Sequence, residues 1–439
     1  MNSRLKKIIL FTGDFIALFL ALSMVLSVRY PKIDFNSQLN DHLGPFSLIF
    51  AIWLIIIYVS GLYDLNLRVK GRRFFRSVLS AAAIASLISV IYFYLNIASN
   101  VTPKTNLALF IVFFLVIFYA WRYLHQTISH AVPKTGLAII GSNQKSLAIE
   151  EELKKNPSTG YQTELIIKSE VEFSELKNQV ENGKIKIIVV CDDFSSSATT
   201  DTLLSLLQNR ISVFSYPDFY ELLSGKIPVE TISATWFLEN LRENQKNYFN
   251  FFKRIIDITL AVLAFIVSLI FWPLIALIIK LESKGPAFIK QIRLGRRGQN
   301  FTLIKFRTMK EEGNDRGITL ENDNRITKFG NFLRKTRIDE IPQMINILKG
   351  EMSFIGPRPE RPEFAKELEL SVPFYNTRLI VKPGVTGWDQ VSGEYHSPTK
   401  EDTLKKLQND LFYIKNRSLF LDTTIILKTI ATILSREGR

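Results

Sequence analysis

The chain has 439 residues, a formal net charge of +14 and a hydrophobic fraction of 47%. Its mean hydropathy of +0.12 is high for a wholly soluble protein. The single cysteine, Cys191, excludes a disulfide framework or a cysteine-rich metal site, and four scattered histidines argue against a zinc enzyme. A basic excess is typical of proteins that bind nucleic acid, anionic lipid headgroups or phosphorylated substrates, and the apolar blocks described next favour the last two.

Residues 1–130 are predicted to form four membrane-spanning helices, because a bilayer is crossed by about 20 consecutive apolar residues. The apolar blocks are Ile8–Val28, Leu43–Leu62, Ser77–Ala98 and Thr105–Leu124. Lysines and arginines gather before the first block, between the second and third, and after the fourth. The positive-inside rule therefore predicts that both ends of this bundle lie in the cytoplasm. Asp14 lies inside the first block, where it can pair helices or, alternatively, have a functional role.

Residues 131–235 are predicted to form a small Rossmann-like α/β module, because short apolar runs alternate with helical stretches. The expected helices include Ser146–Lys155 and Thr200–Gln208, and the expected strands are Leu137–Ile140, Thr163–Ile167, Ile185–Val190 and Ile211–Ser215. The first strand ends at Gly141 without the G-x-G-x-x-G pattern that lets a backbone approach a pyrophosphate. A structural or regulatory module is therefore favoured over a dinucleotide site.

Residues 236–252 are interpreted as a linker, and a fifth apolar block, Ile255–Ile279, follows it. Lysines and arginines flank this block on both sides, so both ends are expected in the cytoplasm. Pro273 lies inside the block, where it removes a helix hydrogen bond and favours a kink. We predict a re-entrant helix over residues 253–280, and an ordinary fifth span is the alternative.

The segment Thr336–Gln343 carries two adjacent carboxylates, Asp339 and Glu340. In one interpretation a helix begins here, with Asp339 as its N-cap, Glu340 complementing the helix dipole and Gly350 ending the helix. In the other, one carboxylate attacks phosphorus and the other binds a divalent metal. Arg334 and Arg337 are three residues apart, so they can share a face and neutralise phosphate oxygens.

Three further clusters favour the chemical interpretation. They are a basic segment with Lys305 and Arg307, a stiff turn formed by Pro357, Arg358 and Pro359, and a Pro/Gly turn with Lys382 and Thr386. Two cations around an aromatic can hold a phosphate, and a rigid turn reduces the entropy that Arg358 loses when it binds one. A basic strand facing lipid headgroups and simple loops are the structural alternatives.

These motifs, in this order, resemble the bacterial polyprenyl-phosphate phosphoglycosyl transferases, the monotopic sugar transferase superfamily. The resemblance covers about residues 249–435, and it rests on the ordered set Lys253-Arg254-x-x-Asp257, Pro273, Gly285-Pro286, Gly295-Arg296-x-Gly298, Lys305–Met309, Asp339–Gln343, Gly356–Pro359 and Lys382–Trp388. The N-terminal bundle and α/β module look like those of the large members that initiate exopolysaccharide, capsule or O-antigen synthesis. Asp389 and Ser392 depart from the family pattern next to the last motif.

The resemblance implies a membrane protein whose third part, residues 253–439, is a monotopic α/β catalytic domain on the cytoplasmic face of the bacterial inner membrane. It implies transfer of a hexose-1-phosphate from a UDP-sugar to undecaprenyl phosphate, with UMP released and Mg²⁺ as cofactor. Asp339 would carry a covalent phosphosugar, Glu340 would help to bind Mg²⁺ and Arg358 would contact the nucleotide. Lys253, Arg254 and Asp257 would face the lipid phosphate at the start of the re-entrant helix, and the resemblance favours a homodimer.

Three other functions remain as alternatives. A non-enzymatic scaffold of a polysaccharide assembly complex would tolerate replacement of Asp339. A metal-dependent phosphodiesterase or pyrophosphatase would release UMP without a lipid acceptor. Nucleic-acid binding is disfavoured, because the basic residues cluster at the ends of spans and no recognition helix or RNA-binding aromatic motif is found.

Overall fold

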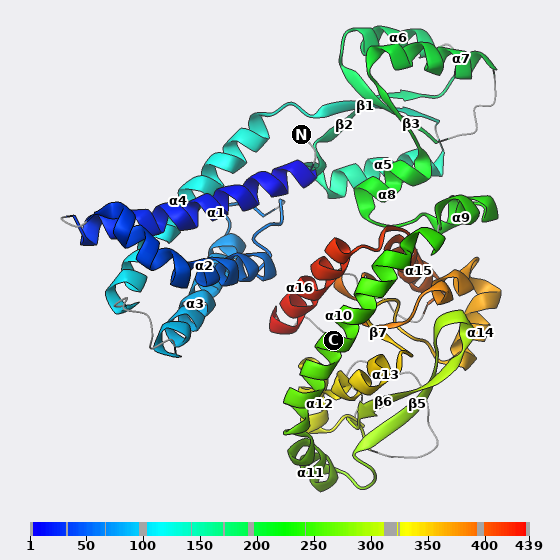
Figure 1. Ribbon diagram of the computed structural model, residues 1–439. Coiled ribbons are helices and arrows are strands. Elements are labelled where there is room, and N and C mark those ends of the chain that lie inside the picture. The colour runs from blue at the N-terminus through cyan, green and yellow to red at the C-terminus, as the bar shows by residue number, and fades with distance from the viewer. Residues whose placement is uncertain are drawn as a thin grey trace. The chain divides into compact units, whose positions relative to one another are not determined.

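The computed structural model describes residues 3–31, 34–65, 67–95, 103–141, 143–169, 172–191, 197–241, 243–310, 323, 325–392 and 399–435. The chain divides into two compact units, Met1–Ser224 and Gly225–Arg439. The first unit holds the helical bundle and the α/β module, and the second holds the motif-rich C-terminal part (Figure 1).

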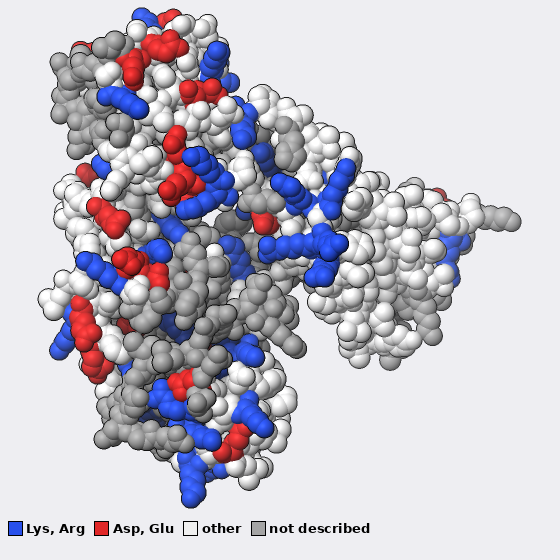
Figure 2. All heavy atoms as spheres, turned by 180° about the vertical axis from the view of Figure 1, so that it is seen from behind, with Lys and Arg blue, Asp and Glu red and all other residues white. Residues whose placement is uncertain are grey.

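Four long helices form the bundle: α1 (Ser3–Arg29), α2 (Phe35–Val59), α3 (Arg72–Leu95) and α4 (Pro103–Ala131). Each contains a stretch that is by length and composition able to cross a membrane, as the sequence predicted for four helices. Side chains such as Leu22, Phe46 and Phe110 are fully buried between the helices, whereas Leu87 and Val116 are more than 60% exposed. Figure 2 shows a broad surface of the bundle without charged residues. Helices that are apolar on their outer faces as well fit a lipid environment.

Asp14 pairs two helices of the bundle. Its Oδ2 lies 2.6 Å from Nη2 of Arg122 on α4, and both side chains are buried. Arg122 also donates from Nη1 to the carbonyl of Leu62 at 2.7 Å. The helices approach closely beside this pair, because a Cβ added to Gly13 would lie 2.0 Å from the Trp121 ring. These contacts support the structural interpretation of Asp14.

The α/β module is a four-stranded parallel sheet in the order β2-β1-β3-β4. Helices α6 and α7 cover one face of the sheet, and α5 and α8 cover the other (Figure 1). All four predicted strands and both predicted helices are confirmed, and the bounds are β1 (Thr135–Ile140), α5 (Gln144–Lys155), β2 (Tyr161–Ile167), α6 (Phe173–Glu181), β3 (Ile185–Val190), α7 (Ser197–Leu206), β4 (Ser212–Ser215) and α8 (Tyr216–Ser224).

The second unit begins earlier than the sequence predicted. Residues 225–235, which we had placed in the α/β module, belong to the C-terminal unit. Ile227 and Val229 are buried against Leu407 and Leu411 of helix α15 (Lys400–Asn416), and the Ile227 N–H donates to the carbonyl of Gln408. The apolar residues at this boundary therefore pack in the hydrophobic core of the C-terminal unit.

Two small sheets organise the second unit. Strands β5 (Phe288–Leu294) and β6 (Asn300–Phe306) are antiparallel, and β7 (Ser353–Ile355) and β8 (Gly384–Thr386) are parallel. The helices packed around them are α9 (Ala234–Asn240), α12 (Lys328–Lys335), α13 (Met344–Lys349), α14 (Pro362–Ser371), α15 and α16 (Leu419–Ser435). Helix α16 packs on this unit through the fully buried Ile425.

The fifth apolar block forms two helices, α10 (Asn247–Leu269) and α11 (Trp272–Glu282), which meet at an angle of 61°. Pro273 lies in the first turn of α11, where its missing N–H has no partner to lose. Ala261 packs α10 against Met344 and Ile347 of α13, whereas Ile270 at the bend is 78% exposed. By length and composition this pair fits a broken span or a re-entrant loop.

The buried pair in the bundle predicts a specific stability pattern. Asp14→Leu should lower the stability of the bundle by about 3–5 kcal/mol, because it leaves the buried Arg122 guanidinium without its counter-charge. Thermal unfolding of the protein in detergent measures this loss. Asp14→Leu combined with Arg122→Met should recover much of it, since no charge is then left unpaired. A single variant as stable as the wild type would contradict this role of the pair.

Candidate active site

The two adjacent carboxylates lie at the start of a helical segment. A short 3-10 helix, η7 (Ile338–Gln343), runs into α13, and Gly350 ends that helix with a φ of 86°. The predicted helix and its glycine stop are therefore confirmed. Asp339 is not the N-cap, however: that position is held by Arg337, whose φ of 58° turns the chain. This turn carries Asp339 and Glu340 inward, where both are buried.

Glu340 is surrounded by cations. Its Oε1 lies 2.8 Å from Arg358 Nη2, 3.1 Å from Lys305 Nζ and 3.5 Å from Arg337 Nη1. The three cations come from the turn after β7, from β6 and from the residue before η7. Burial opposes the negative charge, yet these cations hold the pKa of Glu340 well below its usual range. Glu340 is therefore a permanent anion at neutral pH.

Asp339 is in a different electrostatic state from its neighbour. Burial, followed by the charge of Glu340, raises the pKa of Asp339 to about 6. Its Oδ1 is buried and accepts no hydrogen bond in the described part of the chain. At neutral pH this carboxylate is mostly ionised, and its Oδ1 has no hydrogen bond among the described residues. Two carboxylates whose pKa values are pushed apart commonly have two different chemical roles.

Arg334 belongs to the outer part of the same cluster. Its Nε donates to Thr308 Oγ1 at 2.9 Å, and its charge interacts with that of Asp339. The structure thus brings four of the predicted phosphate-binding residues together around the two carboxylates: Lys305, Arg337, Arg358 and Arg334.

Close backbone packing positions the Pro357–Pro359 turn. It leaves β7 through Gly356, whose N–H donates to the carbonyl of Thr386. A Cβ at Gly356 would lie 2.4 Å from the carbonyl oxygen of Lys382, and one at Gly384 would lie 2.1 Å from the Gly356 nitrogen. The two glycine motifs of the sequence therefore meet here because only glycine allows this approach.

Three predicted binding residues lie away from the carboxylates. Arg307 is buried and donates from Nη2 to the carbonyl of Ser283 at 2.8 Å. Thr386 Oγ1 lies 2.8 Å from Thr429 Oγ1 on α16. Lys382 lies beside Gly350 and Arg254 at the end of α13. These residues support the surrounding segments of the site in this structure.

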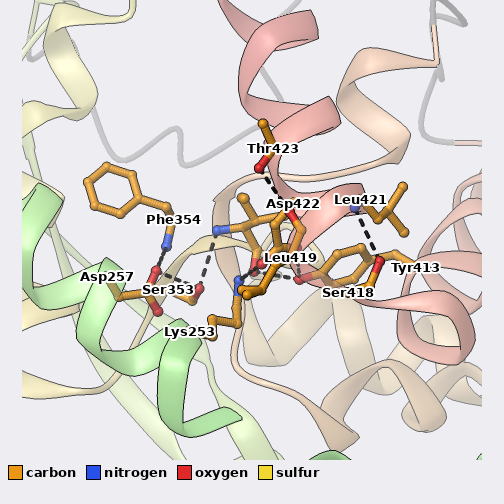
Figure 3. Close-up of polar contacts among 11 residues, drawn as sticks. Lys253, Asp257, Ser353, Phe354, Tyr413, Ser418, Leu419, Leu421, Asp422 and Thr423 are labelled. Carbon is orange, nitrogen blue, oxygen red and sulfur yellow. Dashed lines mark hydrogen bonds and ion pairs between the residues drawn. The ribbon is translucent and has the colours of Figure 1, made fainter. Parts of the chain in front are cut away.

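Three polar residues at the start of α10 bond within the unit, and Figure 3 shows two of them, Lys253 and Asp257. Lys253 Nζ lies 2.6 Å from Asp422 Oδ2, and Asp257 Oδ1 accepts from Ser353 Oγ and the Phe354 N–H, each at 3.1 Å. Arg254 donates to the carbonyls of Ile347 and Leu348 at the end of α13. We predicted these side chains to face a lipid phosphate; in the structure their described contacts tie α10 to the segments on either side of the site.

Several residues of this framework were missed by the sequence reasoning. Tyr413 donates to Asp422 Oδ1 at 2.9 Å, and Arg378 forms a buried ion pair with Asp410, with Nη2 2.7 Å from Oδ2. Glu360, which pairs with Arg378 and Lys406, also belongs to this framework. It directly follows the Pro357–Pro359 turn, so the sequence could have indicated it. The others lie far along the chain from the motifs, and sequence spacing carries no signal for such pairing.

The carboxylates also bear on the expected Mg²⁺. Among the described residues, no three His, Cys, Asp or Glu side chains are grouped so that they could hold a metal ion. In phosphoryl-transfer sites, however, Mg²⁺ commonly binds through one or two carboxylates together with substrate phosphates. Glu340, a buried and ionised carboxylate beside Asp339, would hold the ion in that mode together with the substrate.

Comparison with known proteins gives a consistent result. The family model described as "Bacterial sugar transferase" matches residues 248–436. The chain is 42% identical over 220 residues to a UDP-N-acetylgalactosamine-undecaprenyl-phosphate N-acetylgalactosaminephosphotransferase of Aeromonas hydrophila. This match covers 48% of this chain and 51% of the Aeromonas protein. The chain is also 34% identical over 342 residues to a UDP-glucose:undecaprenyl-phosphate glucose-1-phosphate transferase of Xanthomonas campestris pv. campestris. This second match covers 73% of this chain and 67% of the Xanthomonas protein.

The matched parts span about half of the Aeromonas protein and two thirds of the Xanthomonas protein. The family model extends from the first turn of α10 through the whole of α16, so it includes the carboxylates, the surrounding cations and the bent helix pair. The chain therefore belongs to the bacterial sugar transferases, a family of polyprenyl-phosphate phosphoglycosyl transferase enzymes.

Proposed function

We propose that this protein transfers a hexose-1-phosphate from a UDP-sugar to undecaprenyl phosphate through a covalent intermediate on Asp339. The observation that carries the proposal is the asymmetry of the two carboxylates. Asp339 keeps a buried oxygen without a hydrogen bond, while Glu340 alone takes the contacts of Lys305, Arg337 and Arg358. An available carboxylate beside preformed cations suits attack on a diphosphate.

In the first half-reaction, Oδ1 of Asp339 attacks the β-phosphorus of the UDP-sugar. A bond forms between Oδ1 and that phosphorus, and the bond from the β-phosphorus to the oxygen bridging to the α-phosphorus breaks. UMP leaves with that oxygen and its electron pair. The sugar phosphate remains on Asp339 as a mixed carboxylic–phosphoric anhydride.

In the second half-reaction, a phosphate oxygen of undecaprenyl phosphate attacks the same phosphorus. The new bond completes the lipid diphosphate, and Asp339 leaves as a carboxylate. Since a diphosphate bond is broken and a similar one is formed, the whole exchange lies near equilibrium and UMP should reverse it.

The cations around Glu340 serve to bind and orient phosphate oxygens. Lys305, Arg337 and Arg358 converge on one oxygen of Glu340, so an arriving diphosphate finds donors already in place. Mg²⁺ held by Glu340, together with the substrate, would offset charge on the diphosphate. Asp339 remains the group that attacks, because the charge of Glu340 is compensated by the cations.

The membrane arrangement fits two substrates of different solubility. We propose that α10 and α11 form a re-entrant pair at the cytoplasmic face of the inner membrane, because basic residues flank both ends and apolar side chains are exposed around the bend. A catalytic unit seated there meets the water-soluble UDP-sugar on one side and the headgroup of the lipid phosphate at the interface. The sequence prediction that the four-span bundle begins and ends in the cytoplasm agrees with this arrangement.

Replacing the nucleophile tests the reaction. Asp339→Asn should reduce lipid-dependent UMP release by at least about a thousandfold, because an amide neither attacks phosphorus efficiently nor leaves from it. The measurement is UMP release by the purified protein with Mg²⁺, undecaprenyl phosphate and a panel of UDP-sugars.

Glu243→Gln provides the matched control, because it also neutralises a partly buried, ion-paired carboxylate, which contacts Arg417 away from the site. This variant should keep the wild-type rate. Full activity in Asp339→Asn would exclude the covalent mechanism and favour the scaffold. UMP release that needs no lipid and continues over many turnovers would favour a hydrolase.

The covalent intermediate should accumulate when the acceptor is withheld. Wild-type protein incubated with the correct UDP-sugar and Mg²⁺ but no lipid should gain the mass of one sugar phosphate, mapped by peptide mass spectrometry to the segment that contains Asp339. The same treatment should leave Asp339→Asn unmodified. A modified peptide elsewhere in the chain would assign the nucleophile to another residue.

A further inference from the structure

Four consecutive carbonyl groups in the arginine turn are each bound by a donor from another segment. The donors to Pro357 and Glu360 are the backbone N–H groups of Gly384 and Leu294, each at 2.9 Å. The two carbonyls between them are bound by guanidinium groups: Arg378 Nη2 lies 2.9 Å from the oxygen of Arg358, and Arg293 Nη1 lies 3.1 Å from that of Pro359. Every residue of the Pro357–Glu360 turn therefore has its carbonyl group held by a hydrogen bond from outside the turn.

Arg378 is itself held in one orientation. Its side chain is almost fully buried, and it lies 2.7 Å from both Asp410 Oδ2 and the Tyr375 hydroxyl. Glu360, the last residue of the turn, also lies within ion-pair distance of Arg378 and contacts Lys406. The planar guanidinium can make these bonds at the same time because its donors diverge in one plane, which a lysine ammonium cannot reproduce.

Arg293 reaches the turn from a different segment of the unit. It lies on β5, donates from Nη2 to Gln291 Oε1 at 2.9 Å, and is followed by Leu294, whose N–H binds Glu360. Strand β5 and the segment around Arg378 therefore both bind the turn. In the described part of the chain neither arginine contacts Asp339 or Glu340, whereas both bind carbonyls of the turn that carries Arg358.

We propose that Arg378 and Arg293 are positioning residues that fix the backbone of the Pro357–Glu360 turn and thereby aim the guanidinium of Arg358 at the diphosphate. This inference rests on the proposed function, in which Arg358 binds phosphate oxygens. The Arg358 side chain is 34% exposed and reaches Glu340 across a single contact. Its position therefore depends on its backbone, and misplacement of a binding group by about 1 Å can cost up to a hundredfold in rate.

The test is a pair of double-mutant cycles. Arg378→Lys should lower kcat/KM for the UDP-sugar by about tenfold or more, and Arg293→Lys should lower it in the same direction. In an Arg358→Ala background, which keeps the carbonyl of residue 358 but removes its side chain, each lysine variant should change the residual kcat/KM by less than about twofold. Radiolabelled sugar-phosphate transfer to undecaprenyl phosphate measures the low rates, and Arg417→Lys is the control for a buried, ion-paired arginine elsewhere in the unit.

Additive effects of Arg378→Lys and Arg358→Ala would overturn the inference, because a merely structural arginine would lower the rate equally in both backgrounds. Wild-type activity in both lysine variants would overturn it as well. Thermal unfolding in detergent reports whether Arg378→Lys folds, and if it does not, the cycle with the half-buried Arg293 decides. A wild-type protein without lipid-dependent UMP release would instead defeat the proposed function, so the two failures are distinguishable.

Discussion

The site depends on one electrostatic arrangement, the convergence of Lys305, Arg337 and Arg358 on a single oxygen of Glu340. These cations come from three separate segments, and without the glutamate their charges would repel one another in a buried space. Glu340 therefore holds the cations together before substrate arrives. The charges of these cations also act on Asp339, whose Oδ1 is left without a hydrogen bond among the described residues. The same glutamate thus orders the phosphate-binding groups and leaves the nucleophile available.

The rest of the C-terminal unit keeps these segments in register. Helix α13, which follows the carboxylates, is tied to α10 by Arg254, and strand β7, which leads into the Arg358 turn, is tied to α10 by Asp257. Helix α10 is also the first half of the apolar bent pair. The element proposed to enter the membrane is therefore bonded directly to both sides of the catalytic centre. A change in how this helix sits in the bilayer would reach the site through two short connections.

Much of this architecture could be predicted from the sequence. Hydropathy was sufficient for the four spans, and alternating apolar runs were sufficient for the strands of the α/β module. The adjacent carboxylates and nearby arginines could be proposed as a site because phosphate chemistry needs those groups. Of the two interpretations of Asp339, the structure excludes the helix cap, since the left-handed turn at Arg337 moves the start of the helix and carries both carboxylates into the interior.

Long-range pairing could not be predicted. Lys253 meets Asp422 and Arg378 meets Asp410, and in neither case does the local sequence indicate the partner. The boundary between the two units was likewise placed too late, because Ile227 and Val229 look equally suitable for either core in the sequence. The long-range ion pairs and the unit boundary both depend on how distant segments pack. The spacing of motifs along the sequence carries no information about that packing.

Isotope exchange tests the central claim, that Asp339 alone can cleave the UDP-sugar and hold its sugar phosphate. Radiolabelled UMP would be incubated with the unlabelled UDP-sugar, Mg²⁺ and the protein, with no lipid phosphate present. A covalent intermediate predicts that label enters the UDP-sugar at a rate comparable to turnover, because UMP reverses the first half-reaction. Label that enters only after undecaprenyl phosphate is added would contradict the account and require direct transfer between the two substrates.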